Sequence, residues 1–185
     1  MVLCSASAPV VVAQDGLRRV SIDGAIGGGH GWRGGERVER GLIATDFLVA
    51  IQLADTRQGF LAGVDAGGYW QMNGDLLCLA RVTGGCIPQY PGFDALSVVG
   101  GYQWRLAPVL RLRVLVGPGY YTAYFDHNTT TSHSLGLGAR TDVAVPLSQF
   151  LSATVAARGG WVSRIRGQSY VPGAVVIGLR LGAGE

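Results

Sequence analysis

Lysine is absent from this sequence of 185 residues, so all 15 of its basic side chains are arginines. The arginines are scattered along the chain, and no run exceeds the pair at Arg18 and Arg19. A nucleic-acid-binding protein would gather its cations into a patch or stripe, so nucleic acid is excluded as a partner. Charge of either sign is also scarce, at 15% of residues against roughly 25% in an average soluble domain.

Long apolar runs are missing as well. A membrane-spanning helix requires about 18 apolar residues or more, whereas the longest uncharged stretch, 143–157, is interrupted by Pro146. If this protein enters a membrane, it does not do so as a helix. Glycine is abundant instead, with 30 residues that show no period of three, which excludes a collagen. The mean hydropathy of +0.28 excludes a disordered linker.

Only three cysteines are present, and the first lies in a small, apolar N-terminal segment, MVLCSASAPVVVAQD. The triplet VVA before Gln14 is typical of a signal-peptide cleavage site, so we interpret 1–13 as a truncated signal peptide and 14–185 as the mature domain. Export would leave Cys78 and Cys86, an even pair in one polar loop, which predicts a disulfide. Neither has a Cys or His partner at zinc spacing, so we expect no metal site and no cofactor.

Apolar residues alternate with polar or small ones in eight segments of the chain. These segments are 20–26, 41–51, 60–70, 96–104, 110–117, 134–145, 151–161 and 174–181. A period of two predicts β-strands with two chemically different faces. Four of these runs are 11 or 12 residues long and the other four are 7 to 9, whereas strands of soluble proteins cluster near 5 or 6. A tilted strand that crosses a bilayer needs about 9 to 11 residues.

The connections between these segments alternate in length. The long connections are roughly 31–40, 72–93, 125–133 and 162–171, and the short ones are roughly 53–58, 105–109 and 146–149. Long loops on one side and short turns on the other are typical of transmembrane barrels. We therefore expect an all-β fold, an eight-stranded antiparallel up-and-down transmembrane β-barrel.

The two faces of the strands differ in charge. One face is almost free of charge, whereas the other carries aspartates on the first three strands and arginines on the last four. In a soluble barrel the charged face would point outward, and in a membrane barrel it would line the lumen. Because unpaired buried charge is costly, we expect a lumenal network that plugs the barrel, formed by Asp23, Asp46, Asp65, Arg111, Arg113, Arg140, Asp142, Arg158 and Arg180.

Aromatic residues cluster at the predicted strand ends, where a membrane barrel carries an interfacial girdle. With the first strand running outward, the outer-rim set is Trp32, Trp70, Tyr120, Tyr121, Tyr124 and Trp161, and the inner-rim set is Trp104 and Phe150. A soluble core would more often bury tryptophan in mid-strand. The aromatic positions thus favour the membrane barrel.

A G-x-G-x-x-G match at Gly29, Gly31 and Gly34, with Asp55 about twenty residues on, has the form of a dinucleotide-binding fingerprint. That motif requires a helix to begin near Gly34, but the following segment is rich in β-branched residues. With this much glycine, chance matches are frequent. We interpret the stretch as the end of the first strand and the first outer loop.

Four segments, VSIDGAIGGGHGW, FLAGVDAGGYW, LSVVGGYQWRL and LRVLVGPGYYTAYF, resemble strands of the small eight-stranded outer-membrane barrels of Gram-negative bacteria, of the OmpA-like and opacity-protein type. The resemblance covers roughly residues 17–181 and is one of pattern. It implies a cell outer-membrane protein with periplasmic termini and mobile outer loops.

The function expected from these features is a structural or surface-interaction role, as a monomer whose partners are outer-membrane lipids and an extracellular or surface molecule bound by the loops. One alternative is a hydrolase resembling lipid A deacylases, which use a His and a Ser near the outer rim. Here His133 and Ser134 are adjacent and would point to opposite faces of a strand. We therefore predict no catalytic residue, and a metal site at His127 and His133 is disfavoured. A second alternative is a soluble lipocalin-like barrel that holds an apolar ligand.

Overall fold

The computed structural model describes residues 20–37, 41–53, 58–71, 92–125 and 130–182. Three predictions fall outside these residues: the signal peptide at 1–13, the disulfide between Cys78 and Cys86, and any role of His127. In the described ranges, no helix has the length and apolar character required to cross a membrane.

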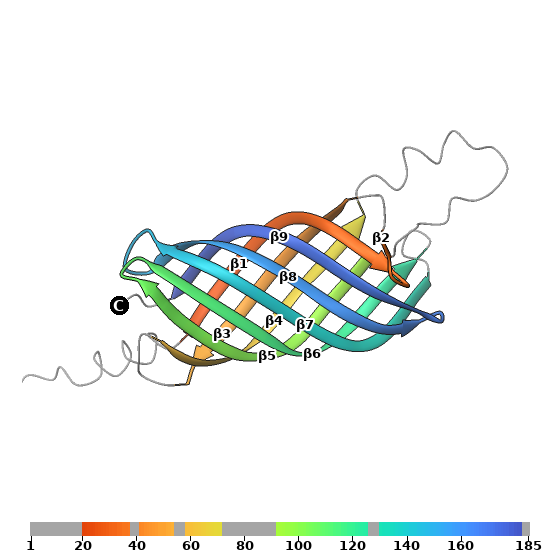
Figure 1. The fold of residues 1–185 in the computed structure, drawn as a ribbon, viewed down its shortest axis with the longest axis horizontal. Helices are drawn as coiled ribbons and strands as arrows, with labels where there is room; N and C mark the ends of the chain where they lie inside the picture. The colour runs from red at the N-terminus through yellow and green to blue at the C-terminus, as the bar shows by residue number, and fades with distance from the viewer. Residues whose placement is uncertain (1–19, 38–40, 54–57, 72–91, 126–129, 183–185) are drawn as a thin grey trace, which may run out of the picture.

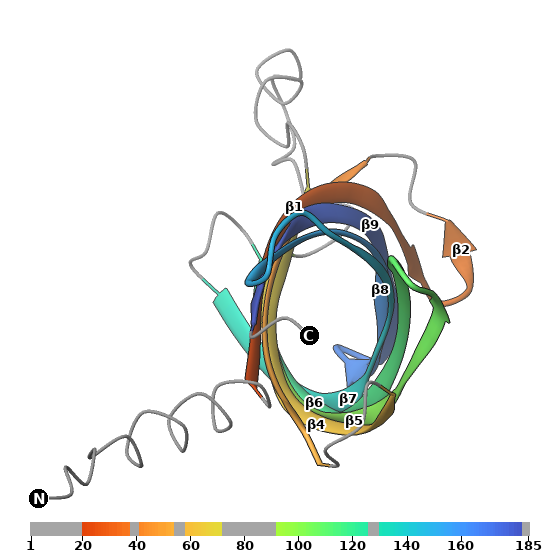
Figure 2. The same ribbon diagram turned by 90° about the vertical axis from the view of Figure 1, so that its left-hand side faces the viewer.

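Eight long antiparallel strands close into a barrel, which confirms the predicted fold class (Figures 1 and 2). The strands are β1 (Val20–Arg33), β3 (Leu42–Gln52), β4 (Gly59–Gln71), β5 (Gly92–Ala107), β6 (Leu110–Phe125), β7 (Thr130–Pro146), β8 (Leu151–Ile165) and β9 (Gln168–Gly182). A two-residue strand, β2 (Glu36–Arg37), pairs only with the end of β1. Each long strand pairs with the next, and β1 pairs with β9 to close the ring.

The barrel has two distinct ends. We call the end where β1, β4, β6 and β8 finish the outer end, and the end that holds Val20 and Gly182 the inner end. At the inner end the turns are short, with only two residues between β5 and β6 and four between β7 and β8. At the outer end only the connections from β1 to β3 and from β4 to β5 are long, whereas those from β6 to β7 and from β8 to β9 have four and two residues. The predicted alternation in connection length is therefore wrong for the second half of the barrel.

The strands extend further at the outer end than the sequence pattern predicts. The segment 162–171 was expected to be a loop, but β8 and β9 continue through it and join at Arg166 and Gly167. Likewise β7 begins at Thr130 inside the expected loop 125–133, and β1 runs to Arg33. In these end segments apolar and polar side chains no longer alternate, although the backbone hydrogen bonds between the strands continue. The sequence pattern therefore underestimates the length of the strands there.

The two faces of the strands have opposite polarity in the folded barrel. Exposed apolar side chains surround the outside on every long strand, including Phe60, Val98, Leu135 and Ile177, which are 51% or more exposed. Every charged side chain that is fully buried points to the inside. This arrangement is the reverse of a soluble barrel and excludes the lipocalin-like alternative.

Interior glycines allow close contact between strands. A Cβ added to Gly117 in β6 would overlap the carbonyl oxygen of Val98 in β5, and one added to Gly101 would overlap the carbonyl oxygen of Val114. In both cases the added atom would meet a backbone oxygen, which cannot move aside by changing rotamer as a side chain can. Gly24 differs, because nothing lies within 4 Å of the position its Cβ would take on the outer face.

These contacts predict different effects for two glycine-to-alanine substitutions. Gly117→Ala should lower the free energy of unfolding by about 1–3 kcal/mol, since β5 and β6 must move apart. Gly24→Ala should change it by less than about 0.5 kcal/mol, because its methyl group enters open space. Unfolding in urea, followed in detergent by heat-modifiable gel migration, measures both. Equal stability of the two variants would contradict this account of interior packing.

Candidate functional site: the charged interior of the barrel

Among the residues that the structure describes, eight charged side chains are buried in the interior, four acidic and four basic. None is more than 6% exposed, and all lie at inward-facing positions of their strands: Asp23, Asp46, Asp65, Asp142, Arg113, Arg140, Arg158 and Arg180. Because side chains alternate across a strand, this inward set is fixed by the same register that turns the apolar residues outward.

Three ion pairs cross the bore between strands that lie opposite each other in the barrel. In the closed order β1, β3, β4, β5, β6, β7, β8, β9, strands four places apart are opposite. Asp23 on β1 pairs with Arg113 on β6, and Asp46 on β3 pairs with Arg140 on β7. Asp65 on β4 lies 3.5 Å from Arg158 on β8. The first strands supply the carboxylates, and the later strands supply the guanidinium groups.

Asp142 joins these pairs into one network. Its carboxylate accepts hydrogen bonds from Nε of Arg113 at 3.0 and 3.1 Å and from Nε of Arg140 at 3.0 Å, and it also pairs with Arg180. Arg180 donates from Nε to Asp23 at 2.9 Å. Asp142 therefore holds three arginines on β6, β7 and β9 together and reduces their mutual repulsion.

Arg158 extends the network toward the outer end. Its Nη1 lies 3.1 Å from Asp46 and donates to the carbonyl oxygen of Thr45 at 2.5 Å. Its guanidinium carbon lies 5.0 Å from the centre of the Tyr69 ring, so a cation–π contact adds to the ion pairs.

Arg111, also predicted to belong to this network, lies on the same inward face of β6 as Arg113, two residues closer to the inner end. Its side chain is half-buried, and its backbone lies opposite Arg105 on β5 and Ala144 on β7 in the strand register. The inward face of β6 therefore holds one arginine at the inner end and a second, Arg113, in the network.

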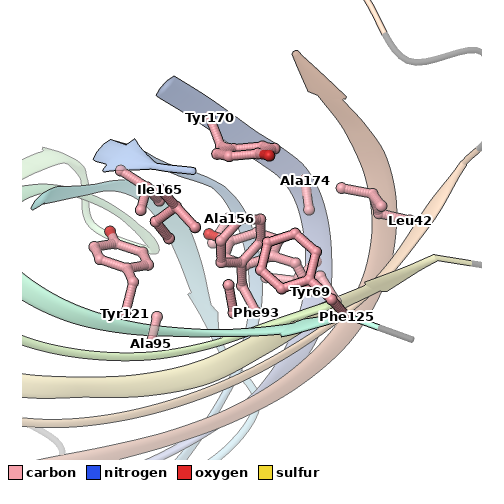
Figure 3. Packing of buried hydrophobic residues seen from close by; sticks show 14 residues of the cluster. Leu42, Tyr69, Phe93, Ala95, Tyr121, Phe125, Ala156, Ile165, Tyr170 and Ala174 are labelled. Atoms are coloured by element: carbon pink, nitrogen blue, oxygen red, sulfur yellow. The ribbon is translucent and has the colours of Figure 1, made fainter. Parts of the chain in front are cut away.

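An aromatic and aliphatic cluster lies in the interior at the outer end (Figure 3). Phe93 on β5 contacts Tyr170 on β9 edge to face, with ring centroids 5.5 Å apart. These two strands are also opposite, so this contact spans the fourth diameter of the barrel. The alternating sequence pattern did not predict this cluster, although Tyr69 and Asp65 lie four residues apart and therefore share a face of β4.

Tyr121 is the one predicted girdle residue that points inward; it is 1% exposed. Its hydroxyl donates to the carbonyl oxygen of Leu137 at 3.0 Å. Its ring lies so close to Gly136 and Gly160 that a Cβ at either position would collide with it. Interior glycines thus make room for a large side chain inside a narrow barrel.

A second apolar cluster lies on β3 to β6, formed by Leu48, Ala50, Leu61, Val99 and Leu115. On β3 the inward residues run from Leu42 and Ala44, through Asp46, to Leu48 and Ala50. The charge on this strand is therefore flanked by apolar side chains on both sides, which limits the access of water to it.

The other predicted girdle residues lie on the outside of the barrel, toward its ends. Six are 38% exposed or more: Trp32, Trp70, Tyr120 and Trp161 toward the outer end, and Trp104 and Phe150 at the inner end. Tyr124 is half-buried and donates its hydroxyl to Asp94 at 2.6 Å. Tyr102 adds to the inner rim, with its ring 5.1 Å from Phe60 and 4.8 Å from Trp104.

The serine and histidine considered for hydrolysis are not brought together. His133 is exposed on the outside, stacked on Tyr120 with ring centroids 5.5 Å apart and bonded to Thr122 at 3.2 Å. Ser134 is half-buried and shares a hydrogen bond of 2.5 Å with Ser163. The imidazole therefore has no contact through which it can activate the hydroxyl of Ser134.

No protein-family model matches the chain, and no curated protein is detectably similar to it in sequence. Solved structures do match. Neisserial surface protein A aligns with a TM-score of 0.64 at 12% identity, over 88% of this chain and 95% of the other. The N-terminal barrel domain of OprF from Pseudomonas aeruginosa aligns with a TM-score of 0.54 at 12% identity, over 90% and 98%.

The chain folds as an outer-membrane β-barrel. A third match, the attachment invasion locus protein Ail of Yersinia pestis, aligns at a TM-score of 0.50 and 14% identity, over 88% of this chain and 97% of the other. At such identities the likeness concerns the fold. Together with the apolar exterior, these matches support the predicted location of the barrel in the outer membrane.

The network predicts a large effect of removing one carboxylate. Asp23→Asn should lower the free energy of unfolding by about 3–5 kcal/mol, because Arg113 and Arg180 would remain buried with too little negative charge. The control is Asp94→Asn, at a half-buried position outside the network, which should cost about 1 kcal/mol or less. Urea unfolding in detergent measures both, and a loss for Asp23→Asn no larger than that of the control would contradict the network's role.

Proposed function

We propose that this protein is a monomeric outer-membrane barrel with a plugged interior and a structural or surface-interaction role. The observation that carries the proposal is the set of ion pairs across the bore, which occupy its centre with four guanidinium groups and four carboxylates. The four positive and four negative charges give this network no net charge.

The apolar clusters support the same conclusion. The aromatic cluster at the outer end brings Phe93 and Tyr170 into contact across the barrel, and Tyr121 is held by a hydrogen bond to Leu137. A water-filled channel would require these side chains to line a lumen rather than meet across it.

The exterior supports outer-membrane lipids as the main partner. Apolar side chains cover the outside of all eight long strands, between aromatic residues toward the two ends. Since this band surrounds the whole barrel and lipid can cover all of it, the fold requires no second protein subunit. In the proposed orientation the inner end, with its short turns, faces the periplasm, and the outer end presents surface loops.

Conductance tests the plugged interior. The full chain reconstituted in a planar lipid bilayer should give no stable current steps, because no continuous water path crosses the ion network. Heat-modifiable gel migration of the same sample shows that the barrel is folded. Stable steps proportional to salt concentration would contradict the proposal.

A paired variant makes the assay more discriminating. Arg113→Ala combined with Asp142→Ala removes two large interior side chains without changing the net charge, and it should produce resolvable steps. The matched control, Val98→Ala with Val116→Ala, shortens two exposed exterior side chains and should stay silent. Equal conductance of these two variants would show that the interior network does not block the bore.

A further inference from the structure

Strands β7 and β8 separate at the outer end of the barrel. Their ladder ends where Gly136 pairs with Val162. Strand β7 nevertheless begins at Thr130, and β8 continues to Ile165. Beyond the ladder, among the residues that the structure describes, β7 pairs only with β6 and β8 only with β9. The edge of β7 at 130–135 therefore has backbone groups that no neighbouring strand pairs with.

A β-bulge turns the end of β8 away from β7 and into the barrel. Val162 pairs with Tyr170 and Ile165 pairs with Gln168, so the register shifts by one residue between the two pairs. In a regular strand Val162 and Ile165 would point to opposite faces, because they are three residues apart. Here both are buried in the outer aromatic cluster, at 0% and 3% exposed (Figure 3). The extra residue of the bulge therefore folds the hairpin inward.

The tip of this hairpin, which we define as residues 163–169, reaches over the outer mouth of the barrel from β8 toward β6. The guanidinium carbon of Arg166 lies 4.1 Å from the centroid of the Phe125 ring on β6. Strand β7 lies between β6 and β8 in the wall, so the tip passes β7 to make this contact. Phe125 is an inward-facing member of the cluster and is 7% exposed. The tip thus covers part of the aromatic cluster.

The tip is joined to the wall by backbone hydrogen bonds on the β9 side only. There the carbonyl oxygen of Ser169 accepts a hydrogen bond of 3.0 Å from the amide of Gly34, next to β1. On the β8 side, beyond the ladder, the hydroxyl groups of Ser134 and Ser163 share a hydrogen bond of 2.5 Å, which is a contact between side chains. This arrangement allows the tip to swing about β9 when the serine contact breaks.

The wall offers a second place for the tip. If the β7–β8 register continued by two residues, position 164 would lie opposite Ser134, and the edge of β7 would gain the backbone hydrogen bonds that it lacks. The same movement would remove Ile165 from the cluster and Arg166 from Phe125. The hydrogen bonds gained oppose the burial lost, which is the condition for two populated positions.

We propose that the tip, residues 163–169, is a lid of the outer mouth with two positions. In the closed position, which the structure shows, it covers the aromatic cluster. In the open position, β8 pairs with the edge of β7, and Phe93 and Phe125 become accessible from outside the barrel. The ion network lies below the cluster, so the bore stays blocked in both positions.

Thiol labelling of a buried position tests the opening. Ala123 on β6 belongs to the cluster and is 0% exposed, so a polar maleimide should reach a thiol in Ala123→Cys only when the lid opens. The matched control is Val99→Cys, which is 2% exposed but lies in the second apolar cluster. In the folded barrel, Ala123→Cys should be labelled about tenfold faster or more, because local opening is cheaper than unfolding. Equal labelling rates would overturn the lid.

Loss of the serine contact should shift the lid toward its open position. Ser163→Ala, combined with Ala123→Cys, should raise the labelling rate about fivefold, as expected for the loss of one hydrogen bond. The control is Ser152→Ala, which removes a hydroxyl group at the inner end of β8 and should leave the rate unchanged. A Ser163→Ala rate no higher than that of the control would contradict the proposed movement.

A disulfide across the open register tests the second position. Ser134→Cys with Arg164→Cys should cross-link under mild oxidation, because the open position sets these residues directly opposite each other. Ser132→Cys with Arg164→Cys is two residues out of that register and should not cross-link. Peptide mass mapping distinguishes the new bond from any that involves a native cysteine. Equal cross-linking of the two pairs, or none in either, would overturn the open position.

These outcomes are separate from those that test the plugged interior. A folded barrel in which Ala123→Cys and Val99→Cys are labelled alike has no lid, yet its ion network can still block the bore. The Ser163→Ala barrel should also remain silent in the planar bilayer. Current steps from this variant would show that the lid, and not the ion network alone, blocks the bore, and would contradict the last step of the inference.

Discussion

The pairing of arginine and aspartate across the bore is the interaction on which the rest of the structure depends. An eight-stranded barrel has a narrow interior, and charges placed there must be neutralised on site. Asp23, Asp46 and Asp65 on the first strands meet Arg113, Arg140 and Arg158 on the strands opposite. Each pair links the two halves of the chain, so the network forms only when the ring is closed.

The inverted polarity of the barrel follows from this network. Because the charges satisfy one another inside, the outer surface can be apolar throughout, and lipid takes the place that water has around a soluble protein. The aromatic contact between Phe93 and Tyr170 spans the fourth diameter, between β5 and β9. Interior glycines such as Gly117 and Gly160 complete the arrangement, since they leave space for neighbouring backbone and for Tyr121.

Alternation in the sequence was sufficient to predict the strand number, the closure and which residues share a face, because a period of two is a local property. It did not reveal which partners meet across the bore. That depends on the register of eight strands, so Arg111 and Arg113, two residues apart on one face, have different surroundings. The extension of β8 and β9 to Arg166 was missed because cross-strand hydrogen bonds there do not depend on side-chain polarity.

Depth-dependent quenching of tryptophan fluorescence by brominated lipids tests most directly the claim that the apolar face contacts acyl chains while the charges stay inside. Trp32, Trp70, Trp104 and Trp161 all lie on the exterior toward the barrel ends, so the unmodified chain carries its own probes. The account predicts strong quenching when bromine is near the headgroups and weaker quenching when it is near the chain ends. Fluorescence unaffected by bromine at any depth, but quenched by aqueous iodide, would contradict it.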